Sequence, residues 1–323
     1  MTDDIRFEIA HLARVELHTP DPDGTLWFFQ ELLGMYETGR EGRSVYLRGY
    51  EDPYVWSLKV TEGPVPRLGH AALRTSSPEA LSRRVEAIRR AGLPGRWTDG
   101  DLGYGPAYEF TGPDGHEFRL LWEAEKYRAP AELESKILTR PSKRPLRGIP
   151  VKRLDHLNLM AAEVTPTKVF LEQRLGLRTR ERVVDGETEI GAWLSSNLLG
   201  HELAIMRDNL GAHGRLHHVA FYYGCQQHNL DAAEMFRERD VTIEAGPDRH
   251  GITQGAFLYV FEPGGNRIEL FGDAGILELE PDWETRTWSM SDIDTGMAIG
   301  GTKLPWESYF TYGTPPAALV PSA

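Results

Sequence analysis

Three apolar segments in the second half of the sequence each contain one residue that can bind a metal ion. These residues are His156 in LDHLNL, His218 in LHHVAF and Glu269 in NRIELF. Two histidines and one carboxylate form a facial metal triad, which leaves three neighbouring coordination positions open to other molecules. A lone histidine on an apolar strand is more often a hydrogen-bonded core residue than a ligand. Because all three lie on equivalent strands of a repeated unit, we expect a metal site.

Two histidines stand side by side in the segment GRLHHVAF, and strand geometry predicts different places for them. Successive side chains of a strand point to opposite faces. His218 is therefore expected to face the metal together with Leu216 and Ala220, and His217 is expected on the other face. We expect His217, like His213 and His228, to be a structural or surface residue.

Those strands belong to a unit that the sequence repeats. IAHLARVELHTPDPDGTLWFFQELLGM (9–35) resembles LDHLNLMAAEVTPTKVFLEQRLGL (154–177), and RLGHAALRTSSPEALSRRVEAIRRAGL (67–93) resembles RLHHVAFYYGCQQHNLDAAEMFRERDV (215–241). Each copy reads as a strand, a polar turn, an amphipathic helix and further strands. The pattern predicts an α+β fold with four such modules, two in each of two domains.

The first half has His11, His70 and Arg119 where the second half has the three candidate ligands. Arginine cannot bind a cation, so this half is expected to lack the metal. We place the N-terminal domain at residues 1–128, a proline-rich linker at 129–150 and the metal-binding domain at 151–275. A tail at 276–323, which carries several tryptophans, is expected to pack on the second domain.

Composition narrows the range of partners. The chain has 323 residues and a formal net charge of −12, which disfavours nucleic acid and anionic membranes because both attract basic surfaces. It contains no apolar run of ~18 residues, the length needed to cross a bilayer. The acidic start MTDDIRFEIA and the single cysteine, Cys225, fit a cytoplasmic protein. A small-molecule ligand is expected.

The motifs GRLHHVAF, GPDRHGIT, FLYVFEPGGNRIELF and LDHLNL resemble those of the type I extradiol ring-cleaving dioxygenases of the vicinal-oxygen-chelate superfamily. The nearest subgroup is the catechol 2,3-dioxygenases, or metapyrocatechases. The resemblance covers nearly the whole chain. It implies duplicated βαβββ modules, two per domain, with each domain a partly closed mixed β-barrel surrounded by helices.

Position by position, the resemblance implies roles for particular residues. His156, His218 and Glu269 match the metal ligands of the family. His201 in GHELAI matches the histidine that acts as acid–base catalyst. Three further residues match groups near the substrate; they are His250, Tyr259 and Asn158, of which Asn158 varies in role among relatives.

The resemblance also implies the reaction. Triplet O2 reacts poorly with a singlet ring, and a redox-capable metal with three open positions can bind both catechol oxygens and O2 together. Non-haem Fe(II) is the usual occupant of such a triad, and Mn(II) serves some members with the same ligands. Meta cleavage of the catechol then gives a yellow 2-hydroxymuconic semialdehyde-type product, as in aromatic hydrocarbon catabolism. The family is commonly a homotetramer, so a homo-oligomer is expected.

Substrate choice and function class stay open at this point. Ala245 stands where relatives that cleave carboxylate-bearing catechols have an arginine, which favours neutral catechols, including methyl, chloro and biphenyl-type diols. One alternative is a metal-dependent isomerase or lyase of the same superfamily. Another is a non-catalytic ligand-binding protein of the same fold. The isomerase or lyase usually needs a fourth protein ligand and lacks the set formed by His201, His250 and Tyr259, whereas the binding proteins discard the metal ligands.

Overall fold

The protein is an α+β structure in which one strand–helix–strand module occurs four times. The computed structural model describes residues 5–273, 275, 280 and 282–315. The first half contains β1 (Ile9–Thr19), α1 (Pro22–Trp27), the π-helix η1 (Phe28–Leu32), β2 (Tyr36–Glu41), β3 (Ser44–Arg48), β4 (Leu58–Glu62), β5 (Arg67–Thr75), α2 (Pro78–Arg90), β6 (Gly95–Thr98), β7 (Ala107–Thr111) and β8 (Glu117–Leu121). The second half contains β9 (Arg153–Ala161), α3 (Val164–Leu175), β10 (Arg178–Asp185), β11 (Thr188–Ser195), β12 (Leu203–Arg207), β13 (Arg215–Tyr222), α4 (Gln226–Glu238), β14 (Ile243–Arg249), β15 (Ala256–Phe261) and β16 (Arg267–Gly272). The predicted βαβββ repeat is confirmed.

The strands form two mixed sheets with the same internal order. The first sheet runs β2-β3-β4-β1-β5-β8-β7-β6, and the second runs β14-β15-β16-β13-β9-β12-β11-β10. In each sheet the first strands of two modules pair antiparallel at the centre, β1 with β5 and β9 with β13. The pairing leaves each sheet open between its end strands.

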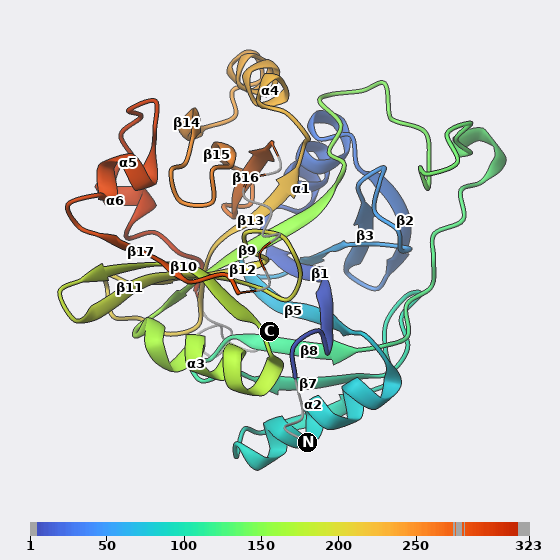
Figure 1. Ribbon diagram of the computed structural model, residues 1–323. Helices are drawn as coiled ribbons and strands as arrows, with labels where there is room; N and C mark the ends of the chain where they lie inside the picture. Colours follow the sequence, from blue (N-terminus) through green and yellow to red (C-terminus); the bar gives the residue numbers. More distant parts are fainter. Residues whose placement is uncertain (1–4, 274, 276–279, 281, 316–323) are drawn as a thin grey trace.

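Local sequence signals set where the long helices begin and end. Ser77 caps α2, since its side chain accepts a hydrogen bond from the Ala80 amide at 3.1 Å, and Pro78 occupies the first turn. Gly176 ends α3 in the left-handed conformation with φ of 76°. The helices α2, α3 and α4 lie on the outside of the sheets (Figure 1).

The two halves share one continuous apolar core. Phe28 stacks on Phe236 and Phe29 meets Phe221 edge-on, each pair with ring centroids 5.8 Å apart. Buried carboxylates also link the halves: the Leu12 amide donates to Glu202 at 2.9 Å, and the Leu154 amide donates to Asp52 at 3.2 Å. Burying these charges is tolerable because each accepts backbone or hydroxyl hydrogen bonds.

The remaining segments cover the outside of the molecule. The linker contains the short 3-10 helix η2 (Ala131–Leu133) and runs around the edge of the molecule (green in Figure 1). The later elements are β17 (Arg286–Ser289), α5 (Ile293–Met297) and α6 (Trp306–Tyr309). Strand β17 extends the second sheet by pairing with β10, which the sequence did not predict. Within the described part of the chain, no helix combines the length and apolarity needed to cross a bilayer.

Candidate metal centre and active site

The structure brings His156, His218 and Glu269 together from three neighbouring strands. His156 lies on β9, His218 on β13 and Glu269 on β16, and β13 is the strand between the other two. Ala220 of β13 is in register with both His156 and Glu269. Its small side chain leaves the two larger ones free to converge above it.

The three side chains point their ligand atoms at one spot. Glu269 Oε2 lies 2.9 Å from His156 Nε2 and 3.0 Å from His218 Nε2, and the two histidine Nε2 atoms are 3.3 Å apart. All three residues are buried. Burial acts to raise the pKa of Glu269, but His156 and His218 hold the pKa of this carboxyl well below its usual value, so it is ionised.

A β-bulge brings the adjacent His217 against the His218 ring. Leu216 pairs with Leu159 and His218 pairs with Asn158, so His217 is an extra residue on β13. His217 Nδ1 lies 2.6 Å from His218 Nδ1, and the His217 side chain is fully buried. The prediction that His217 occupies the opposite face is therefore wrong, because simple alternation does not hold across a bulge.

Hydrogen bonds behind the two histidines orient them. His156 Nδ1 donates to Asp155 Oδ2 at 2.9 Å, which points Nε2 at the centre. Burial acts to lower the pKa of His156, but Glu269 and Asp155 raise it to about 9, so Nε2 would release a proton when a metal binds.

His217 Nε2 lies 2.7 Å from the Tyr309 carbonyl and must donate to it, so His217 Nδ1 accepts from His218 Nδ1. His218 Nε2 is thereby left as a free ligand atom. Neither the contact of Asp155 nor the role of His217 was predicted from the sequence.

His201 lies directly over the metal triad, in the loop before β12. Its ring centroid is 3.9 Å from that of His156, and it lines the narrow cavity above the ligand atoms. Burial and the neighbouring His156 lower the pKa of His201 well below its usual value. The imidazole is therefore neutral, with one ring nitrogen unprotonated.

His250 and Tyr259 lie on the other side of the same cavity and are hydrogen-bonded to each other. His250 follows β14, and its Nε2 is 3.0 Å from the Tyr259 hydroxyl on β15. The Tyr309 hydroxyl donates to the Tyr259 hydroxyl at 3.2 Å. Burial and the nearby Glu269 raise the pKa of Tyr259 well above its usual value, so Tyr259 keeps its proton. Tyr309, from the tail, was not among the predicted site residues.

Asn158 is buried opposite His218 on β9 and lines the same cavity. Its Nδ2 contacts Met206 Sδ at 3.7 Å, and its Oδ1 is buried without a hydrogen-bond partner. Further lining residues that the sequence did not single out come from β11, from the loop after β14 and from the tail; they are Trp193, Ile252, Thr253 and Met297. These have no local chemical signal, since the fold alone brings them to the site.

The first half carries arginines at two of the three equivalent positions. Ala72 of β5 is in register with Arg14 and with Arg119, just as Ala220 is with His156 and Glu269. Arg14, and not His11, thus corresponds to His156. The predicted match of His11 was wrong because β1 contains two irregularities, between Ile9 and His11 and between Leu12 and Arg14, that shift its register.

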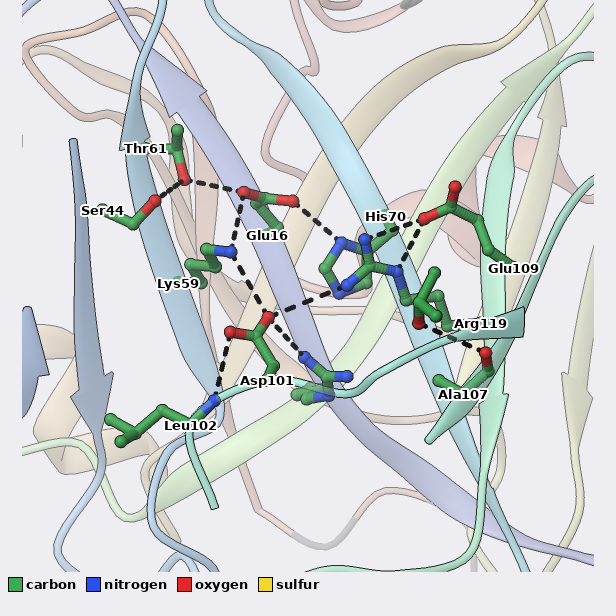
Figure 2. Close-up of polar contacts among 12 residues, drawn as sticks. Glu16, Ser44, Lys59, Thr61, His70, Asp101, Leu102, Ala107, Glu109 and Arg119 are labelled. Atoms are coloured by element: carbon green, nitrogen blue, oxygen red, sulfur yellow. Dashed lines mark hydrogen bonds and ion pairs between the residues drawn. The ribbon is translucent and has the colours of Figure 1, made fainter. Parts of the chain in front are cut away.

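Asp101 occupies the centre of this first-half cluster. Its Oδ2 is 3.2 Å from Arg14, 3.3 Å from Lys59 and 3.7 Å from Arg119. Figure 2 shows the Asp101 carboxylate between Lys59 and Arg119, with His70 hydrogen-bonded to Glu16 beside them, at 2.9 Å. Arginine and lysine side chains already surround the carboxylate of this cluster, and their positive charge would repel a metal cation. The expectation that this half binds no metal agrees with these charges.

The second-half centre has the composition of a metal site. Its three ligand atoms lie within 4.8 Å of one another, and they are two imidazole nitrogens and one carboxylate oxygen, the donors that suit first-row divalent metals. Glu269 Oε1 is buried without a hydrogen-bond partner. A buried, ionised and incompletely bonded carboxylate is costly unless a cation offsets it. The residues therefore fit a divalent metal ion.

Comparison with known proteins agrees with this geometry. The family model for the glyoxalase/bleomycin resistance protein/dioxygenase superfamily matches residues 9–120 and 153–270. The chain is 46% identical to a metapyrocatechase of Geobacillus stearothermophilus over 96% of this chain and 94% of that protein. It is 34% identical to a manganese-dependent 2,3-dihydroxybiphenyl 1,2-dioxygenase of Geobacillus genomosp. 3 over 92% and 95% of the two chains.

A solved structure gives the same result for the fold. An extradiol ring-cleaving dioxygenase from B. fuscum superposes with a TM-score of 0.83 at 25% identity, covering 97% of this chain and 84% of that one. The α+β fold predicted from the repeats is thus the fold of a solved extradiol enzyme.

Proposed function

This chain belongs to the glyoxalase/bleomycin resistance protein/dioxygenase superfamily, and we propose that it is an extradiol dioxygenase that opens a catechol ring with O2. The observation that carries the proposal is the buried set of His156, His218 and Glu269 with His201 directly above it. The metapyrocatechase that is 46% identical supports the same reaction. The chain is accordingly an oxidoreductase of the catechol 2,3-dioxygenase type.

His156, His218 and Glu269 would hold the metal, for which Fe(II) is our first choice. When bound, such a metal holds the catechol oxygens and O2 next to each other and lets electron density pass between them. Mn(II) is the alternative, supported by the manganese-dependent relative that is 34% identical. That relative also supports a second substrate candidate, a biphenyl-type diol.

The surrounding residues move protons and hold the substrate. His201, neutral and buried, accepts a proton from the catechol hydroxyl and returns it later in the reaction. Tyr259 keeps its proton, and His250 donates from Nδ1 to the Met297 carbonyl and presents Nε2 to the Tyr259 hydroxyl, so these two residues would share one proton beside the substrate oxygens that gain negative charge. Asn158 offers its unpartnered Oδ1 toward the substrate.

An uncharged catechol suits this site. Ala245 packs in an apolar cluster with Phe257 and Tyr259, where a carboxylate would have no partner. Arg249 donates to the Gln254 carbonyl at 2.8 Å and lies 3.6 Å from Asp273. Its charge is thus already offset.

The test is anaerobic reconstitution with Fe(II) or Mn(II), followed by addition of a catechol and air. We expect O2 uptake matched by a yellow ring-opened product. His201→Asn should lower kcat by about 10²- to 10⁴-fold, because it removes the proton acceptor. Glu269→Ala should abolish metal retention, and His228→Asn, at a half-exposed position on α4, is the matched control.

Two negative results of this experiment would have different consequences. Absence of O2 uptake with both metals and several catechols would contradict the dioxygenase, and would favour a ligand-binding protein of this fold. Uptake that does not depend on His201 would contradict only its proposed role.

The oligomeric state, the cellular location and the domain limits follow from the family resemblance and the composition. We propose a cytoplasmic homo-oligomer, a homotetramer by family resemblance, with the domain limits 1–128 and 151–275, the linker 129–150 and the tail 276–323. The single cysteine and the net charge of −12 support a reducing compartment without nucleic acid or membrane partners. Light scattering on the purified protein tests the tetramer.

A further inference from the structure

One wall of the active site is a short loop between β14 and β15 with a strained backbone. Residues 251–255 follow His250, and Ile252 and Thr253 of this loop line the cavity above the ligand atoms. Thr253 and Gln254 both have left-handed backbone angles, with φ of 63° and 57°. Such angles are rare outside glycine and persist only where the surroundings hold the backbone in place. Neighbouring groups must therefore fix this loop.

Hydrogen bonds to other parts of the chain fix it. The Gly251 and Ile252 amides donate to the Gly296 carbonyl of the tail, each at 3.0 Å. The Thr253 amide donates to Glu181 Oε2 on β10 at 2.6 Å. Glu181 is therefore the side chain that accepts a hydrogen bond from the strained part of the loop.

The other oxygen of Glu181 holds the tail. Trp288 Nε1 on β17 donates to Glu181 Oε1 at 3.0 Å, and β17 pairs with β10 at this position. The two carboxylate oxygens thus accept from two different segments, the loop and the tail. Because Glu181 is only 2% exposed, water has little access to either hydrogen bond.

A β-bulge on β10 brings Glu181 behind the wall of the cavity. Arg180 is an extra residue between two register pairs of β10, and Glu181 pairs with Trp193, which lines the cavity. Bulges are common beside active sites, where they redirect a side chain. Glu181 is not among the residues that line the cavity, so it can act on the substrate only through the residues that it holds.

We propose that Glu181 is a positioning residue for the reaction, which holds the loop 251–255 against the tail so that Ile252 and Thr253 form a fixed wall for the substrate ring. The inference rests on the proposed dioxygenase function and adds a residue that supports substrate binding. The metal ligands come from β9, β13 and β16, so Glu181 affects the binding of substrate and not that of metal.

The test is Glu181→Gln in the metal-reconstituted enzyme. The amide oxygen can accept one hydrogen bond, but the NH2 group then faces a second donor, either the Thr253 amide or the Trp288 indole. We expect KM for catechol to rise about tenfold or more and kcat to change less than about threefold, because contacts with the wall are present in both the bound substrate and the transition state. The amount of bound metal should equal that of the parent. An enzyme that was only less stable would lose kcat through loss of active protein and keep its KM.

A second substitution should reverse the effect. Trp288→Phe removes the indole N–H, so in the double variant with Glu181→Gln the amide oxygen can accept from Thr253 while its NH2 group faces no other donor. KM of the double variant should be about threefold or more below that of Glu181→Gln alone. If Glu181→Gln does not fold, Glu181→Asp takes its place, since the shorter side chain cannot reach both donors. The matched control is Glu187→Gln, at an exposed position in the turn after β10, which should leave KM unchanged.

Hydrogen exchange gives a measurement that does not depend on activity. In the metal-free protein, a peptide covering residues 250–256 should exchange about tenfold faster in Glu181→Gln than in the parent, because the Thr253 amide loses its acceptor and the loop opens more often. Peptides from β13 should exchange at the parent rate.

The results distinguish this inference from the proposed function. Catechol cleavage by Glu181→Gln with the parent KM, unchanged exchange of the loop, or loss of bound metal overturns the inference and leaves the dioxygenase intact. A raised KM that the double variant does not lower also overturns it, since the two donors would then not be responsible. Failure of the parent to cleave catechol with Fe(II) or Mn(II) overturns both.

Discussion

At the scale of single residues, the adjacent His217 and His218 act as one hydrogen-bonded unit. The His217 ring joins the His218 ring on one side, at 2.6 Å, and the Tyr309 carbonyl on the other, at 2.7 Å. Because each ring nitrogen has a fixed role in this chain, His218 is held in the tautomer whose Nε2 is free to bind a metal. Tyr309 of the tail thereby helps to orient a ligand that it does not touch.

Replacing His217 tests this orientation. His217→Phe keeps a ring of similar size but removes both hydrogen bonds, so we expect affinity for Fe(II) or Mn(II) to fall about 10- to 100-fold. Equilibrium dialysis with metal analysis measures this directly. His228→Phe at the start of α4 is the control and should keep the parent affinity. Unchanged affinity in His217→Phe would show that His218 needs no such support.

At the scale of elements, the sequence predicts the modules well and the irregularities poorly. Hydrophobic periodicity and the internal repeat were enough for the four βαβββ units, and equivalent strand positions were enough to bring His156, His218 and Glu269 together. The bulge at His217 and the shifted register at His11 were not predictable, because an extra residue in a strand depends on how its partner strand pairs. For the same reason, the tail residue Tyr309 could be recognised only in the folded chain.

In the first sheet, a carboxylate surrounded by cations lies at the position equivalent to the metal centre of the second sheet. Arg14, Lys59 and Arg119 surround the Asp101 carboxylate, and Arg14 is fully buried. Burial acts to raise the pKa of Asp101, but the Tyr46 hydroxyl, Lys59 and Arg14 together lower it, so the carboxylate stays ionised. Its charge offsets that of Arg14, which has no contact with solvent, whereas Lys59 and Arg119 also pair with Glu16 and Glu109.

Asp101→Asn should therefore destabilise the protein. The change leaves the fully buried Arg14 without its counter-charge, and we expect a loss of about 3 kcal/mol in the free energy of unfolding. Denaturant unfolding of the metal-free protein measures it. Glu86→Gln breaks the exposed pair with Arg90 on α2, whose charged atoms are 4.0 Å apart, and should cost less than about 0.5 kcal/mol. A loss below about 1 kcal/mol in Asp101→Asn would mean that the cluster contributes little to stability.

At the scale of the whole molecule, the two halves of the duplicated fold have different roles. Both sheets place a buried polar cluster at the same register positions, but among the described residues only the cluster of the second sheet has a metal ligand set, and β17 of the tail pairs with that sheet. The shared core joins the two sheets, so loosening the first sheet is expected to affect the second.

Buried neutral histidines of the first half should make the whole molecule sensitive to mild acid. Burial lowers the pKa of His70 to about 4 and that of His116 below its usual value. In the unfolded chain these groups titrate near ~6.5. The unfolded state thus binds more protons between pH 6.5 and 4.5, so their contribution to stability is complete above pH 6.5 and is lost as the pH falls.

We expect the free energy of unfolding of the metal-free protein to drop steeply from pH 6.5 to 4.5, by up to about 1.4 kcal/mol per pH unit for each such group. Denaturant titrations at several pH values give this slope. His70→Gln keeps a donor for Glu16 but cannot take up a proton. It should therefore lower the slope of the free energy of unfolding against pH by up to about 1.4 kcal/mol per pH unit. His228→Gln, at a half-exposed position, should leave the slope as it is. Equal slopes in the parent and in His70→Gln would mean that His70 titrates alike in the folded and unfolded chain, and that the acid sensitivity arises elsewhere.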